Sequence, residues 1–143
     1  MPKVARSSKA VSPHEALIYV MIMASAVDRV MSDQEMETIG LIVRRLPAFD
    51  GFDKARLLRV SQDCSDLLAK PDGFEGTLST IHRSLNAEQH RTAYAFAVEI
   101  MAVDKTVNLE EVRLLEILAE RFDLSDLDIA ALKQSAESRF RSL

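Results

Sequence analysis

The sequence predicts an all-α fold, a compact bundle of about seven helices. Almost half of the 143 residues are apolar (48%), while glycine and proline number four each, so helices can continue with few interruptions. Serine and asparagine recur as candidate N-caps, with Glu, Gln or Asp three residues later. A chain of this length forms one domain with a sizeable core. We assign residues 1–11 to a disordered basic tail and residues 12–143 to a single helical domain.

Two capping boxes open the first two helices. Ser12-Pro13-His14-Glu15 places proline at the first helical position and predicts a helix that continues to about Val27. Ser32-Asp33-Gln34-Glu35 has the same cap chemistry and predicts a second helix, which Leu46-Pro47 ends.

The remaining helices follow from apolar spacing and from further caps. A third helix is expected from about Asp53 to Leu68, and a fourth from about Phe74 to Leu85, where two glycines weaken the pattern. Asn86 caps a fifth helix, Asn108 a sixth and Ser125 a seventh.

The first and fifth helices are expected at the centre of the bundle. They cover about residues 13–27 and 87–103, and both are apolar nearly all round. Helices of this kind are buried on every side, so we expect the other helices to wrap around the pair. Two halves related by a pseudo-twofold axis are a consequence of this arrangement.

A ten-residue segment occurs twice in the chain, 76 residues apart and without a gap. Residues 26–35 recur as residues 102–111, which pairs Asp28 with Asp104 and Glu35 with Glu111. Each half thus contains a buried helix, a tight acidic turn and an amphipathic helix. These repeated carboxylates are the main functional lead in the sequence.

The two aspartates follow the carboxyl ends of helices, where the helix macrodipole disfavours negative charge. Three kinds of group can compensate the negative charges of Asp28 and Asp104. They are the adjacent Arg29 or Lys105, the N–H groups at the start of the next helix, or a bound cation. In the second case the acidic residues serve only as turns and caps, since a glutamate at the third helical position is what a capping box requires.

A bound cation is the functional alternative. Asp28, Glu35, Asp104 and Glu111 supply oxygen ligands of the kind that a hard divalent cation prefers, and the four carboxylates could face one another if the halves are related by pseudo-symmetry. The spacing is not that of an EF-hand, which requires ligands at alternate positions, a glycine at the sixth and a glutamate at the twelfth.

Charge and hydropathy limit the partners. The net charge of −4 divides into +3 on the tail (Lys3, Arg6 and Lys9) and −7 on the rest, so we expect other proteins as partners and not nucleic acid. Leu17–Val27 is the most hydrophobic stretch, but its eleven residues are about half the ~20 of a membrane helix. No integral membrane segment is expected, and peripheral association stays open. The tail has no apolar signal region, which indicates a cytoplasmic protein.

Catalytic motifs are lacking in the sequence, so we do not expect an enzyme. The single Cys64 provides neither a disulfide nor a zinc or redox pair, and is expected in the core or on an inert surface. No nucleophile elbow or phosphate-binding glycine loop occurs. We expect His14, His82 and His90 at exposed helix positions.

The repeated segment also resembles the tellurite-resistance TerB family. An apolar helix that ends Ala-x-Asp, a short turn, a small polar cap and a glutamate seven residues after the aspartate is similar to the pattern of that family. The resemblance covers about residues 15–46 and 90–127. It implies an all-helical, non-enzymatic bacterial domain of the cytoplasm, linked to tellurite and other stress responses.

The same resemblance implies a metal site at Asp28, Glu35, Asp104 and Glu111. The family has glycine after the aspartate, where this chain has Arg29 in the first copy and Lys105 in the second. A cation beside each aspartate could replace the metal as its compensating charge. Two function classes therefore follow from the sequence: a stress-response module that binds a divalent cation, and a protein-interaction module in which the acidic residues are only turns and caps.

Overall fold

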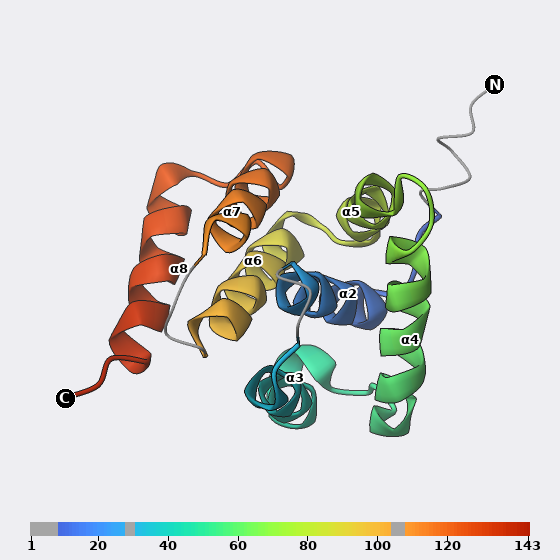
Figure 1. The fold of residues 1–143 in the computed structure, drawn as a ribbon, viewed down its shortest axis with the longest axis horizontal. Coiled ribbons are helices and arrows are strands. Elements are labelled where there is room, and N and C mark those ends of the chain that lie inside the picture. Colours follow the sequence, from blue (N-terminus) through green and yellow to red (C-terminus); the bar gives the residue numbers. More distant parts are fainter. Residues whose placement is uncertain (1–8, 28–30, 104–107) are drawn as a thin grey trace.

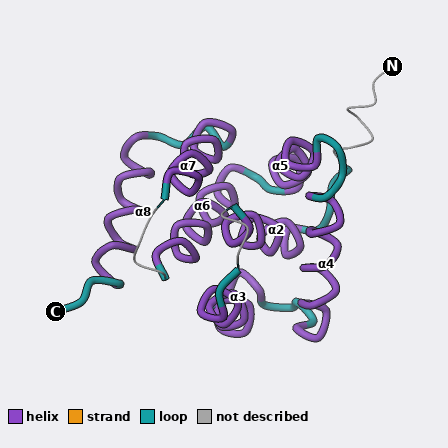
Figure 2. The backbone as a smooth tube through the Cα atoms, viewed as in Figure 1, coloured by secondary structure: helices purple, strands orange, loops and turns teal. Residues whose placement is uncertain are grey.

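The computed structural model of the protein describes residues 9–27, 31–103 and 108–143, and within these ranges it is all-helical (Figures 1 and 2). Seven α-helices confirm the predicted fold class and number. They are α2 (Pro13–Ala26), α3 (Asp33–Arg45), α4 (Leu57–Leu68), α5 (Gly73–Ser84), α6 (Ala87–Ala102), α7 (Leu109–Arg121) and α8 (Asp126–Arg139). Two short 3₁₀ helices, η1 (Pro47–Phe49) and η2 (Lys54–Arg56), connect α3 to α4.

Capping boxes begin four of these helices, as the sequence predicts. In each box the side chain of the N-cap residue accepts from the backbone N–H three residues later, and the side chain at that position accepts from the N-cap N–H. The boxes pair Ser12 with Glu15, Ser32 with Glu35, Asn86 with Gln89, and Asn108 with Glu111. The local sequence thus determines where these helices start.

Helices α2 and α6 form the centre of the molecule. They pack against each other more extensively than any other pair, and every α2 residue from Ala16 to Ser25 is buried. Figure 1 shows α5 and α7 above this pair, α3 below it, and α4 and α8 at the two ends. The sequence prediction of two central helices is confirmed.

The bounds of two helix pairs repeat at the offset seen in the sequence. Helices α3 and α7 each have 13 residues and start 76 positions apart, at 33 and 109, while α2 and α6 end 76 positions apart, at 26 and 102. Ile39 and Leu115 are both buried at equivalent positions. The pseudo-twofold relation between the halves stays a prediction.

Most of the predicted basic tail lies outside the residues that the structure describes, which begin at residue 9. The N–H of Val11 donates a hydrogen bond to Oγ of Ser84 (2.9 Å), which ties the segment before α2 to the end of α5. Across the described ranges, no helix has both the length and the apolar character needed to cross a membrane.

Candidate functional site: the two acidic turns

The first acidic turn leads into α3 through a tight capping box. Oγ of Ser32 accepts a hydrogen bond from the N–H of Glu35 (3.0 Å), and Oε1 of Glu35 accepts one from the N–H of Ser32 (2.9 Å). The backbone of Ser32 is extended (φ −77°, ψ 160°), as an N-cap requires. The Glu35 side chain is completely buried, with 0% of the residue exposed.

The second acidic turn leads into α7 with the same geometry. Oδ1 of Asn108 accepts from the N–H of Glu111 (2.8 Å), and Oε1 of Glu111 accepts from the N–H of Asn108 (3.1 Å). Glu111 is 1% exposed. The two repeats therefore hold their glutamates at equivalent places, and both glutamates are buried.

Burial distinguishes these two glutamates from the other capping residues. In the α2 box the Glu15 side chain is 20% exposed and forms an ion pair with Arg56 (2.7 Å). Partial burial opposes ionisation of Glu15, but the Ser12 N–H and the Arg56 guanidinium outweigh it and lower the pKa of Glu15. In the α6 box Gln89 is half-buried. A capping box does not need a buried carboxylate, so capping alone does not account for the burial of Glu35 and Glu111.

The two aspartates of the predicted site lie outside the described residues. The same holds for Arg29 and Lys105, so compensation of Asp28 and Asp104 by a metal or by these cations stays a prediction. Within residues 9–27, 31–103 and 108–143, no three side chains of His, Cys, Asp or Glu gather as a metal-binding group. Any cation site of the predicted kind therefore depends on the aspartates.

The end of α2 lies beside the start of α7. Val27, which precedes Asp28 in the chain, lines a hollow of about 360 Å³ together with Leu109 and Glu110 from the first turn of α7. The first acidic turn thus begins next to the helix into which the second acidic turn leads. The fold thus brings the end of the buried helix from the first copy of the repeat close to the start of the capped helix from the second copy.

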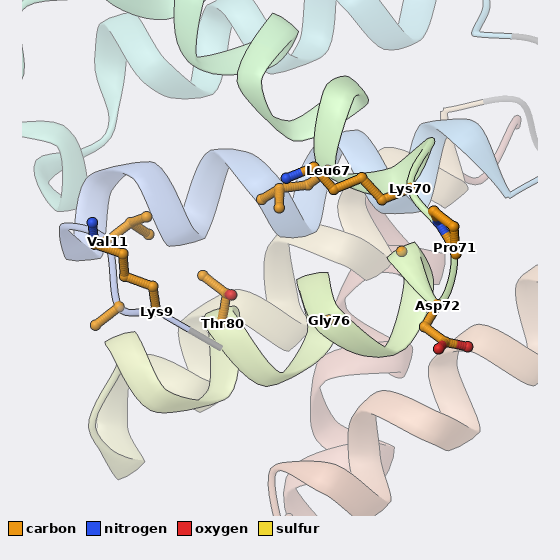
Figure 3. Close-up of a pocket in the computed structure, with 10 residues that line it drawn as sticks. Lys9, Val11, Leu67, Lys70, Pro71, Asp72, Gly76 and Thr80 are labelled. Atoms are coloured by element: carbon orange, nitrogen blue, oxygen red, sulfur yellow. The ribbon is translucent and has the colours of Figure 1, made fainter. Parts of the chain in front are cut away.

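A second hollow, of about 420 Å³, has a different chemistry (Figure 3). It lies between the segment before α2, the end of α4 and α5, and Lys9, Lys70, Asp72 and Thr80 are among its lining residues. Two lysines against the single carboxylate of Asp72 make this hollow unfavourable for a cation. It is separate from the acidic turns.

The expectation of exposed histidines is wrong for His90. His90 is 8% exposed, its ring stacks between His82 (centroids 4.9 Å apart) and Phe122 (4.6 Å), and Nε2 donates to the carbonyl of His82 (3.0 Å). His82 is exposed, as predicted, and His14 is half-buried near Phe49. The sequence carries no signal for this stack, because its members lie on three different helices.

Cys64 is buried, as one of the two sequence alternatives predicts. It is 0% exposed, and Sγ lies 3.7 Å from the carbonyl oxygen of Tyr19. Burial raises the pKa of the Cys64 thiol to about 12, so the thiolate needed for nucleophilic or redox chemistry does not form near neutral pH.

The fold and the repeated sequence define a class of protein: an all-helical domain in which a buried helix precedes, and a capped helix follows, each copy of an acidic segment. The family model described as tellurite resistance protein TerB matches residues 14–134. The chain therefore belongs to the TerB family, as the resemblance indicated, and is a tellurite-resistance-associated domain. A search of curated proteins and a search of solved structures each found no match.

Proposed function

We propose that this domain is a non-enzymatic, cation-responsive module of the stress response, and that it binds a divalent cation through the carboxylates of its acidic turns. Asp28 and Glu35 are the candidate ligands of the first turn, and Asp104 and Glu111 those of the second. Carboxylate oxygens favour hard cations such as Ca²⁺, Mg²⁺ or Mn²⁺.

The observation that carries this proposal is the burial of Glu35 and Glu111. Glu15 and Gln89 occupy the same position in the other two capping boxes and form the same hydrogen bonds, but their side chains are only half-buried. Both buried glutamates belong to boxes that follow an acidic turn, and both occupy the same place in the repeat. A buried carboxylate that recurs at the same place in both copies of an acidic repeat supports a role for its charge beyond capping.

The position of α2 against α7 supports the proposal further. Val27 and the first turn of α7 line one hollow, so the last described residue before Asp28 lies close to the start of the helix whose capping box contains Glu111. We expect this approach to bring carboxylates from both copies of the repeat into one region of the molecule. This fits the predicted ligand set without the alternate spacing of an EF-hand.

Thermal unfolding of the metal-stripped protein with and without millimolar Ca²⁺, Mg²⁺, Mn²⁺ or Zn²⁺ tests the proposal. A cation that binds only the folded state at about 100 times its Kd adds about 2.7 kcal/mol to the free energy of unfolding. For a domain of this size we expect Tm to rise by about 8–12 °C. The rise should be specific to one ion or a few, and should be lost in Asp28→Asn and Asp104→Asn.

Glutamine variants separate metal binding from capping. Gln89 forms a complete capping box in α6, so Glu35→Gln and Glu111→Gln remove a charge while they retain the cap. We expect both variants to remain folded and to lose the Tm response. Glu15→Gln, in a box without an acidic turn, and Asp50→Asn, on an exposed turn, are the matched controls and should respond as the wild type does.

The absence of a Tm response to every ion would overturn the cation site and favour the alternative, a protein-interaction module. Met36 (49% exposed) and Val112 (40% exposed) support that alternative, because they present apolar side chains at equivalent positions directly after the two buried glutamates. In that case the acidic residues are turns and caps, and Ser32→Ala or Asn108→Ala should cost about 1 kcal/mol with no dependence on metal.

A further inference from the structure

An apolar hollow lies between the end of α2, the start of α5 and the exposed face of α7. It has a volume of about 360 Å³, and Val27, Phe74, Leu114 and Ile117 provide most of its apolar lining. Val27 and Phe74 also line an adjoining hollow of about 570 Å³. The Glu75–Arg121 ion pair (2.7 Å) links α5 to α7, and the hollow is present in the single chain.

The rim of this hollow carries an unusually exposed leucine and two opposite charges. Leu109, the first residue of α7, is 83% exposed although it is apolar. Glu110 and Arg113 stand on the same rim, three positions apart and both exposed. One helix thus contributes a protruding apolar side chain, part of an apolar hollow, an acid and a base.

We propose that this face is the contact surface of a weak homodimer, in which Leu109 of each copy enters the α2–α5–α7 hollow of the other. A twofold axis perpendicular to α7 at its first turn makes the two α7 helices antiparallel. It then brings Glu110 of each copy next to Arg113 of the other, which forms two ion pairs across the contact.

A second copy fits this surface better than an unrelated partner because the surface is complementary to itself. Its protrusion and its hollow lie on the same helix, which is what a closed twofold contact requires. Among the described residues that line the hollow, the charges of Glu110 and Arg113 cancel in a protein of net charge −4, so their contact avoids the repulsion expected between acidic faces of two copies. The hollow and its rim are small compared with a permanent interface, so we expect reversible association.

Sedimentation equilibrium over a concentration series up to about 1 mM tests the dimer, with EDTA present so that the result does not depend on the proposed cation. We expect a monomer–dimer equilibrium in the wild type. Leu109→Asp should raise the dimer Kd about tenfold or more, since it places a charge in the partner's apolar hollow. Leu127→Asp is the matched control: Leu127 is 77% exposed in the first turn of α8 but does not line the hollow, and the Kd should not change.

A charge exchange identifies the contact itself. Glu110→Arg and Arg113→Glu should each weaken the dimer by placing like charges opposite each other, and the double variant should return the Kd to within about threefold of the wild type. Circular dichroism of each variant checks that the fold is retained. A wild type that stays monomeric throughout the series would overturn the proposal. Equal dimer Kd values for Leu109→Asp and Leu127→Asp would also overturn it. So would a double variant whose dimer Kd is no lower than those of the single variants.

Discussion

At the scale of single residues, the stack of His82, His90 and Phe122 joins three helices through their aromatic faces. The ring planes of His82 and His90 differ by 15°, and those of His90 and Phe122 differ by 5°. Burial lowers the pKa of His82, and the neighbouring His90, Arg121 and Arg83 lower it further because positive charge disfavours a second cation. His82 therefore binds a proton less readily in the folded state than in the unfolded chain.

This difference predicts a loss of stability in mildly acidic solution. The His82 contribution is fully present above the ordinary histidine pKa of about 6.5 and is lost as pH falls through the lower pKa of the folded state. We expect Tm to fall between pH 7.5 and pH 5.5, and to fall less in His82→Gln. His14→Gln is the control and should keep the wild-type pH dependence, because it leaves the stack intact. An identical pH dependence in His82→Gln and wild type would contradict this assignment.

The residues that the sequence predicts well are those whose role is local. Glu35 and Glu111 could be assigned to capping boxes because their partners are three residues away in the chain. Their complete burial could not be read from the sequence, since it depends on helices that pack over them. The sequence predicts an exposed His90 for the same reason, because its neighbours are His82 on α5 and Phe122 at the C-terminal cap of α7.

At the scale of secondary structure elements, Gly73 shows how a residue that weakens a helix in isolation can be required at its start. The sequence pattern made the fourth helix the weakest, with a start near Phe74, but α5 begins at Gly73 itself. A Cβ atom at Gly73 would lie 2.4 Å from the carbonyl oxygen of Leu68 and 2.5 Å from that of Leu67. The end of α4 therefore approaches α5 so closely that only glycine fits between them.

We predict that Gly73→Ala destabilises the protein by about 1–3 kcal/mol, because backbone atoms must move to accept the methyl group. Gly40→Ala in α3 is the matched control. The new Cβ at position 40 meets only the flexible Arg44 side chain, with Nη1 nearest (3.0 Å), and alanine favours a helix interior by up to about 1 kcal/mol. Urea unfolding of both variants measures the difference. Equal stability of Gly73→Ala and wild type would show that α4 can withdraw from α5 at little cost.

Helix boundaries were predictable where a cap or a proline sets them and less so where packing does. The starts of α3 and α7 follow from Ser32 and Asn108, whose caps are local. The third predicted helix instead divides into η2 and α4, although one helix was expected from about Asp53. The Asp53 side chain accepts from the N–H of Ala55 and begins η2, so the first turn is 3₁₀ and α4 starts at Leu57.

At the scale of the whole molecule, α2 is the element that holds the bundle together. It contacts α3, α4, α5 and α6, and ten consecutive residues of α2 are buried. A helix apolar on every side has no solvent-facing surface, so its position is specified only when its neighbours are in place. Damage to its packing should therefore weaken all of these helices together, and not one end of the molecule alone.

We predict that Ile18→Ala lowers the free energy of unfolding by about 2–5 kcal/mol, because Ile18 is 0% exposed and leaves a cavity in this central helix. Leu58→Ala, at a site that is 77% exposed, should change it by less than about 0.5 kcal/mol. Far-UV circular dichroism reports all helices, while near-UV signals report Tyr19 on α2 and Tyr94 on α6, both buried in a protein without tryptophan. In the wild type and in Ile18→Ala, the far-UV and near-UV signals should change at the same temperature, because the described helices share one hydrophobic core. Separate transitions would show instead that one half of the repeat remains folded when the central pair of helices has come apart.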